Sequence, residues 1–271
     1  MSHDAYAAFS FRRIGAMVLR HLYILRGSWP RVLEMAYWPA VNMVMWGFTS
    51  KFFMDHSSWV AQAAGVLLGA VILWDVLFRG NLGVSLSFLE EMWSRNLGHL
   101  SVSPLRPYEL VVSMLTMSLI RTLIGVLPAA VLAIPLYHYS VFELGLPLVA
   151  FWTNLMVTGW VIGLAVASLV LRFGLGAESL AWVLVFAVAP LSGIYYPIAT
   201  LPSWLQAVAW ALPPAYVFEG MRGVMFGHAL DLHLLTGAVG LNLMYLALTT
   251  GLFLRTYHVA RQRGLLLTQG E

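Results

Sequence analysis

The sequence contains no cysteine and a single lysine, and charged residues make up only 10% of its 271 positions. The lack of cysteine excludes a disulfide framework, an iron–sulfur cluster, a thiolate zinc site and a cysteine nucleophile. A soluble globular domain carries about 25% charged residues, so this chain cannot cover its surface with charge. With 60% hydrophobic residues and a mean hydropathy of +0.80, the composition is that of an integral membrane protein.

The sequence also lacks the patterns of common catalytic sites. A P-loop needs a lysine that reaches the nucleotide phosphates, and the segment around Lys51, Gly47-Phe-Thr-Ser-Lys-Phe52, does not match one. The eight histidines are scattered, no Gly-x-Ser-x-Gly sequence occurs, and the only adjacent carboxylates are Glu90 and Glu91. We therefore expect no enzyme activity, no metal site and no cofactor bound by this chain. The net charge of +3 is too small to indicate nucleic-acid binding.

Long apolar runs predict an all-α membrane protein that forms a single transmembrane domain over residues 1–271. A helix that crosses about 30 Å of hydrocarbon needs about 20 mostly apolar residues. Six transmembrane helices are expected, around residues 35–50, 56–74, 110–142, 144–171, 179–198 and 232–254. The second continues past Asp75 and Arg79, and the third contains Arg121.

The uncharged stretch 179–218 is too long for one span. Its second part contains Pro202, Pro213 and Pro214, and proline removes a backbone donor and breaks helices. Backbone left unpaired at membrane depth is tolerated only where protein or water covers it. Residues 199–228 are therefore predicted to form external re-entrant helices between spans five and six.

The distribution of arginine predicts the orientation, because cytoplasmic segments carry an excess of Lys and Arg. With six spans and an internal N-terminus, twelve arginines are cytoplasmic, and only Lys51 and Arg222 are external. A seven-span alternative gives ten against four. The six-span arrangement, with both termini in the cytoplasm, is favoured.

Residues 8–28 are predicted to form an amphipathic helix that lies at the membrane interface. At 100° per residue, one face collects the apolar side chains of Phe11, Ile14, Val18, Leu22 and Leu25. The other face collects the arginines, which are expected to point toward lipid headgroups and cytoplasm: Arg12, Arg13, Arg20 and Arg26. The alternative is an ordinary cytoplasmic helix folded onto the body.

The loop at residues 86–107 mixes charged and apolar side chains, which suggests a docking surface. Residues 88–95 are predicted to form a short helix in which Glu91 and Arg95 pair at i,i+4. The candidate docking residues are Glu90, Glu91, Met92, Trp93 and Arg95. The alternative is a solvated loop whose charges only set the topology.

Three ionisable residues are predicted to lie within spans. Asp75 and Arg79 stand at i,i+4 and are expected to neutralise each other, although a contact with substrate is a second possibility. Arg121 is a functional candidate by its position alone. Gly159, Gly163 and Ala167 form a stripe of small residues on the fourth span, which favours close helix packing within the monomer.

The block from Pro190 to Arg222 resembles the signature of type-2 ABC-exporter permeases. In that family the fifth span ends in a Gly…Pro element, followed by Leu-Pro, a short helix, a proline break and an arginine. The matching positions here are Gly193, Pro197, Leu201-Pro202, Pro213 and Arg222. The double proline at 213–214 leaves the position of the outer break uncertain.

The resemblance implies a half-transporter in the bacterial cytoplasmic (inner) membrane. It implies a homodimer, or a heterodimer with a similar permease, that pairs with separate ATP-binding cassette subunits, which hold ATP and Mg²⁺. By analogy the segment 88–95 is the coupling helix, and the N-terminal helix lines the cytoplasmic entrance. The outer gate is expected to use Gly193, Pro197, Pro202, Pro213, Glu219 and Arg222.

We expect the transported molecule to be amphipathic or lipid-linked, either a glycan or lipid, or a drug. The alternative from another class is an ATP-independent membrane protein, which is either a secondary transporter or a scaffold subunit. An ATP-binding partner distinguishes the two, because this chain cannot hydrolyse ATP itself.

Overall fold

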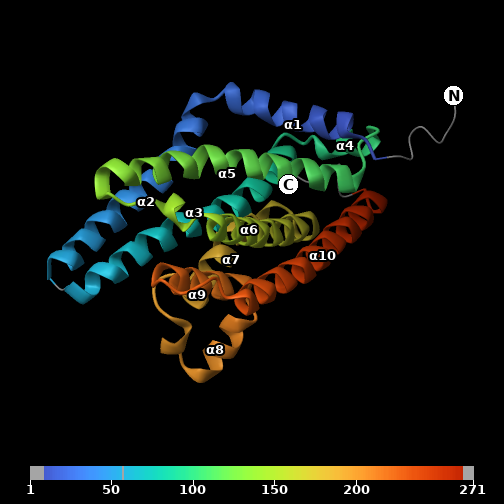
Figure 1. The fold of residues 1–271 in the computed structure, drawn as a ribbon. Helices are drawn as coiled ribbons and strands as arrows, with labels where there is room; N and C mark the ends of the chain where they lie inside the picture. Colours follow the sequence, from blue (N-terminus) through green and yellow to red (C-terminus); the bar gives the residue numbers. More distant parts are fainter. Residues whose placement is uncertain (1–8, 57, 265–271) are drawn as a thin grey trace.

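The computed structural model describes residues 9–56 and 58–264, without the side chains of residues 53–64, and over these residues it contains helices and no strand (Figure 1). The α-helices are α1 (Phe11–Arg26), α2 (Trp29–His56), α3 (Ser58–Trp93), α4 (Leu97–Val102), α5 (Pro107–Tyr137), α6 (Leu146–Phe173), α7 (Leu180–Val188), α8 (Ser203–Trp210), α9 (Pro213–Met225) and α10 (Leu232–Gln262). The 3₁₀ turns are η2 (Val141–Leu144), η3 (Leu175–Ala177), η4 (Ala189–Leu191) and η5 (Ile198–Thr200). The prediction of an all-α protein is confirmed.

Helix α3 forms the centre of the bundle and contacts α2, α5 and α6 (Figure 1). Within their most apolar stretches, 83% of the residues of α3 are buried, against 17% for α10. Helix α10 contacts mainly α6 and α9, and leaves apolar side chains such as Leu243 and Leu248 exposed. Such a surface suits lipid, because hydrocarbon is the favourable solvent for it.

Local sequence explains where the long helices begin and end. Helix α5 starts at Pro107, where the missing N–H costs nothing, and ends at His138 in the left-handed conformation. Helix α10 is capped by Asp231, whose carboxylate accepts the backbone N–H of His233 at 2.8 Å.

Four helices are long and apolar enough to cross a membrane, namely α5, α6, α10 and the part of α3 from Gly65 to Trp93. The expected first span falls in α2, which is 28 residues long but mixes its apolar residues with Asn42 and Lys51. The expected fifth span is shorter than predicted. Helix α7 and η4 together reach only about 18 Å at 1.5 Å per residue, because Pro190 cannot donate a helical hydrogen bond.

The small residues of α6 pack directly against α3, as expected for close packing within the monomer. A Cβ on Gly159 would lie 2.5 Å from the carbonyl oxygen of Leu77, and one on Gly163 would lie 2.9 Å from that of Asn81. The side-chain amide of Asn81 donates to the carbonyl oxygen of Ala181 at 2.8 Å. The same face of α3 therefore fixes both α6 and the start of α7.

This packing predicts opposite effects of one substitution at two glycines. Gly159→Ala should lower the melting temperature of the detergent-solubilised chain, because the added methyl meets fixed backbone and overpacking costs about 1–3 kcal/mol. Gly251→Ala in α10 has open space around it and should be neutral or stabilising by up to about 1 kcal/mol. Equal melting temperatures for the two variants would contradict the close approach of α3 and α6.

Candidate functional site: a charged cluster beneath the N-terminal helix

Helix α1 lies alongside the first part of α5 (Figure 1). Its buried side chains are Ile14, Met17, His21 and Leu25, while Phe11, Leu19 and Tyr23 are exposed. The helix is amphipathic, as predicted, and the ring of Phe11, on its predicted apolar face, is 80% exposed. The face that packs on the body contains a histidine, and the exposed face contains large apolar residues.

Three carboxylates bind α1 to the rest of the protein. The first is the buried carboxylate of Glu109, in the first turn of α5. Arg13 donates to it from Nε at 2.8 Å and from Nη2 at 2.6 Å. The backbone N–H groups of Ser10 and Arg106 donate to the same carboxylate at 2.9 and 3.0 Å. The hydrogen bond to Glu109 raises the pKa of the Arg13 guanidinium above its ordinary value, so this ion pair stays charged at any physiological pH.

The second carboxylate that binds α1 is that of Glu91, near the end of α3. This residue is only 1% exposed. Its carboxylate accepts hydrogen bonds from Arg20 Nη1 and, at 2.6 Å, from Asn96 Nδ2. The ring nitrogen Nε2 of His21 lies 3.6 Å from it. A carboxylate buried to this degree needs such partners, because an unpaired buried charge is very costly.

The third carboxylate that contacts α1 is that of Glu90, the neighbour of Glu91 in α3. Its carboxylate accepts a hydrogen bond from Arg121 Nη2 at 2.8 Å and lies 3.3 Å from His21 Nδ1. Arg31, at the start of α2, reaches it at 3.5 Å. Glu90 therefore joins residues of α1, α2, α3 and α5.

We call these carboxylates and their basic partners the charged cluster; its members are Arg13, Arg20, His21, Arg31, Glu90, Glu91, Glu109 and Arg121. It corrects two predictions. Arg13 and Arg20 do not point toward lipid headgroups, because protein carboxylates bind them, whereas Arg12 and Arg26 are exposed. The predicted ion pair between Glu91 and Arg95 is not formed, since Glu91 is held by α1 and Arg95 lies beyond the end of α3 with a positive φ of 52°.

The predicted docking residues fall into a buried group and an exposed group. Glu91 and Met92 are buried, and Glu90 is enclosed by its partners. Trp93 and Arg95 are exposed. The indole of Trp93 donates to Glu178 at 3.1 Å, which brings this loop beside the loop that follows α6.

Helix α4, which the sequence did not distinguish from the rest of the loop, extends the exposed surface. Its buried side is formed by Leu97, and Val102 is 85% exposed. His99 is also exposed. We call Trp93, Arg95, His99 and Val102 the loop surface. It is connected to the charged cluster directly, because Asn96 binds Glu91.

Asp75 and Arg79, the two charges predicted in the second span, do not form a close ion pair. Among the described residues Asp75 has no ion pair within 4 Å; Asn42 donates to it at 3.4 Å, and Arg79, one turn further along α3, acts on its charge from a longer distance. The Nε atom of Arg79 is buried without a hydrogen-bond partner. Arg79 packs beside Gly125 of α5. A Cβ atom added to Gly125 would lie 3.5 Å from the Nε atom of Arg79.

The segment from Gly193 to Arg222, which we call the outer segment after its predicted position, is held by a second set of polar contacts that joins three of the six predicted gate residues. Glu219 in α9 accepts the backbone N–H of Ile198 at 2.6 Å, and Arg222 donates to the carbonyl oxygen of Gly193 at 2.6 Å. The two side chains are 2.9 Å apart in an ion pair. Gly193 has φ +73°, a conformation that favours glycine.

The three gate prolines lie at the starts of short helical elements. Pro197 precedes η5, Pro202 is the N-cap of α8 and Pro213 is the first residue of α9. Each position leaves no helical hydrogen bond broken. The predicted short outer helices are present, and their depth in the membrane stays a prediction.

Sequence reasoning missed His21, Arg31 and Glu109 as members of the charged cluster. The signal for Glu109 was available, because an acidic residue at the third position of a helix that begins with proline is a capping pattern. Within the described residues no group of three or more His, Asp or Glu side chains could hold a metal ion.

Comparison with protein families finds a match to ABC-2 type transporter over residues 23–226, which is more than half of the chain. The match includes the α2, α3 and α5 members of the charged cluster and the outer segment. It begins within α1, after Arg20. No curated protein matches the chain.

The charged cluster predicts that α1 loosens when carboxylates are neutralised. Met17 lies on the buried face of α1 and is only 4% exposed. Because the chain has no native cysteine, the thiol of Met17→Cys reports how accessible this face is. Adding Glu91→Gln and Glu109→Gln should speed modification of that thiol by a water-soluble maleimide at least about tenfold. A hydrogen bond to a charged group contributes about 1.5–3 kcal/mol, and about 1.4 kcal/mol corresponds to a factor of ten.

The matched control is Arg12→Gln, which alters an exposed arginine of the same helix that has no ion pair with a described residue. It should leave the labelling rate unchanged. If the double carboxylate variant labels as slowly as this control, the ion pairs do not hold α1 in place.

The outer contacts predict a graded loss of stability. Glu219→Ala removes the acceptor of the Ile198 N–H and the ion-pair partner of Arg222, and should cost about 2 kcal/mol or more. Glu219→Gln keeps an acceptor and should cost less. Glu143→Ala, at an exposed position, should have a melting temperature near that of the parent, and equal effects at 219 and 143 would argue against the outer contacts.

Proposed function

Because the chain belongs to the ABC-2 type transporter family, we propose that it is the membrane-spanning permease subunit of an ATP-driven exporter. The observation that supports this function best is the connection between an exposed loop and a buried charged cluster that joins four helices. The chain has no P-loop lysine. The energy for transport would therefore come from a separate ATP-binding cassette subunit, which would hold ATP and Mg²⁺.

In this proposal the ATP-binding subunit docks on the loop surface. Trp93 and Arg95 remain from the docking residues expected from the sequence, and His99 and Val102 of α4 are added. Glu90, Glu91 and Met92 are not contact residues, since they are buried within the permease. An exposed tryptophan next to an arginine is a common composition for an interface.

Movement of the ATP-binding subunit would reach the membrane through the charged cluster. A push on α4 acts on Asn96, which is bonded to Glu91, and the adjacent Glu90 is bonded to Arg121 of α5. Short charge-assisted hydrogen bonds transmit a displacement well, because they are strong and directional. The helices α1, α3 and α5 would then move together.

Aromatic side chains on α2, α3, α7 and the segment between η4 and η5 support an amphipathic or lipid-linked substrate. Trp46 stacks on Tyr195 with ring centroids 5.2 Å apart, and Phe78 lies 5.7 Å from both Trp182 and Phe186. Asp75 lies on α3 one turn before Phe78. Aromatic rings beside a polar group suit a molecule with both kinds of surface, whether a glycan or lipid, or a drug.

The proposed arrangement is multi-pass with six spans, both termini in the cytoplasm and the external segment 199–228 acting as the outer gate. Four membrane-capable helices support multiple crossings. We propose the bacterial cytoplasmic membrane as its location and a dimer, either of two copies or with a similar permease, as the transport unit.

One observation favours a second function, an ATP-independent transporter. Asp75 is buried within α3 without an ion pair to a described residue, and such carboxylates occur in ion-coupled transport. Arg121 no longer supports this alternative, because Glu90 pairs with it.

Purification of the tagged chain from native membranes distinguishes the two functions. A stoichiometric ATP-binding cassette subunit in the purified complex is the expected result. ATP-dependent movement of a candidate substrate into inverted membrane vesicles would then establish the direction as export. A pure chain that transports without any such subunit would reject the exporter.

The docking proposal predicts the effect of charge reversal on the loop surface. Arg95→Glu combined with Val102→Asp should abolish copurification of the ATP-binding subunit and leave the melting temperature of the chain unchanged, because both side chains are exposed. Arg26→Glu, an exposed change on α1, should copurify normally. Retention of the subunit by the double variant would place docking elsewhere.

A further inference from the structure

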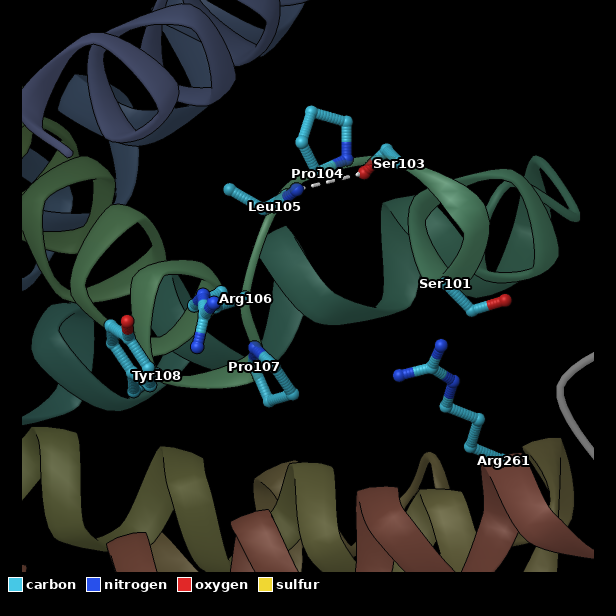
Figure 2. Close-up of a pocket in the computed structure, with 8 residues that line it drawn as sticks. All are labelled: Ser101, Ser103, Pro104, Leu105, Arg106, Pro107, Tyr108 and Arg261. Carbon is cyan, nitrogen blue, oxygen red and sulfur yellow. Dashed lines mark hydrogen bonds between the residues drawn. The ribbon is translucent and has the colours of Figure 1, made fainter. Parts of the chain in front are cut away.

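A pocket of about 310 Å³ lies between residues 101–108 and the end of α10 (Figure 2). Ser101, Ser103, Arg106 and Tyr108 line it from the loop and the start of α5. Figure 2 shows Arg261 extending from α10 toward the loop. The volume is at the lower end of the range for small-ligand sites.

The polar lining of this pocket is suited to an anion. Arg106 and Arg261 bring two positive charges, and none of the lining residues is acidic. Arg261 has no ion pair with a described carboxylate, and the hydroxyl of Tyr108 makes no hydrogen bond with a described residue. The hydroxyls of Ser101 and Ser103 are less available, because they donate to the carbonyl oxygens of Gly98 and Leu100 at 2.7 Å.

Phosphate matches these donors better than other common anions. Guanidinium groups bind its oxygens in pairs, and a phosphate offers acceptors to two arginines at once. A carboxylate has fewer oxygens and a single charge, so it satisfies two guanidinium groups less well. The charge of two arginines also balances a phosphate monoester.

The pocket lies at the ends of two membrane-capable helices, which is the depth of headgroup phosphates when those helices cross the membrane. Pro107 begins α5, and Arg261 is in the last turn of α10, so both walls are ends of helices long enough to cross the membrane. Phe9 stacks on Tyr108 with centroids 6.2 Å apart, and the neighbouring Phe11 is exposed. Exposed aromatic rings next to arginines are typical of a membrane interface.

We propose that this pocket is a binding site for a phosphate group, as carried by an anionic phospholipid headgroup or by a free phosphate ion. The bound group joins the start of α5 to the end of α10, two helices that otherwise touch little. The site needs neither the ATP-binding subunit nor the transported substrate, so it goes beyond the proposed function and can be tested without it.

The experiment measures the melting temperature of the purified full-length chain in uncharged detergent. The probes are short-chain phosphatidic acid, short-chain phosphatidylcholine as the lipid control, and inorganic phosphate. Phosphatidic acid should raise the melting temperature saturably, and phosphatidylcholine should not. Arg261→Gln and Arg106→Gln should each weaken the apparent affinity about tenfold or more, as expected for a charge-assisted hydrogen bond of about 1.5–3 kcal/mol.

Arg255→Gln is the matched control, since it removes one exposed arginine from α10 outside the pocket. It should bind phosphatidic acid like the parent chain. Stabilisation by inorganic phosphate as well identifies a site for the phosphate alone, and stabilisation by phosphatidic acid only identifies a lipid site; both support the proposal.

Two outcomes overturn the proposal. One is the absence of a shift with either phosphate probe, or an equal loss in the Arg255 and Arg261 variants, which would indicate unspecific charge attraction. The other is an Arg261 variant that binds phosphatidic acid normally but no longer copurifies with an ATP-binding subunit. The pocket would then be part of a protein interface.

Discussion

Two adjacent carboxylates near the end of the central helix impose the constraint on which the rest of this structure depends. Glu90 and Glu91 are too enclosed to be stable as unpaired charges. Their partners have to come from outside α3, so α1, the start of α2 and the middle of α5 are all brought to this point. The position of α1 is thus a consequence of electrostatics as much as of apolar packing.

This requirement explains why the amphipathic helix faces the body with basic residues. An interfacial helix normally buries its apolar face. Here Ile14, Met17 and Leu25 are buried together with His21, and Phe11 and Tyr23 remain outside. The helix carries arginines on both sides, because Arg13 is directed inward to a protein carboxylate and Arg12 is exposed on the outside.

The sequence was sufficient for the features that depend on composition and spacing. Apolar length predicted the four helices that are long enough to cross a membrane, proline positions predicted the short helices α8 and α9, and the small residues Gly159 and Gly163 predicted close packing. It was insufficient where a partner is distant in the chain. Glu109 binds Arg13 across 96 residues, whereas local spacing favoured a pair between Glu91 and Arg95. An i,i+4 pair on a surface contributes little, so a buried alternative with better geometry is preferred.

The two ends of the molecule differ in a way that bears on transport. In the outer segment, Glu219 and Arg222 bind backbone groups of Ile198 and Gly193, which fixes the shape of the segment itself. In the charged cluster, the ion pairs connect separate helices through side chains, which can exchange partners without breaking backbone structure. Since a switch requires an element with two arrangements of similar energy, the charged cluster is the part of the chain best suited to change during a transport cycle. The outer segment is better suited to move as one unit.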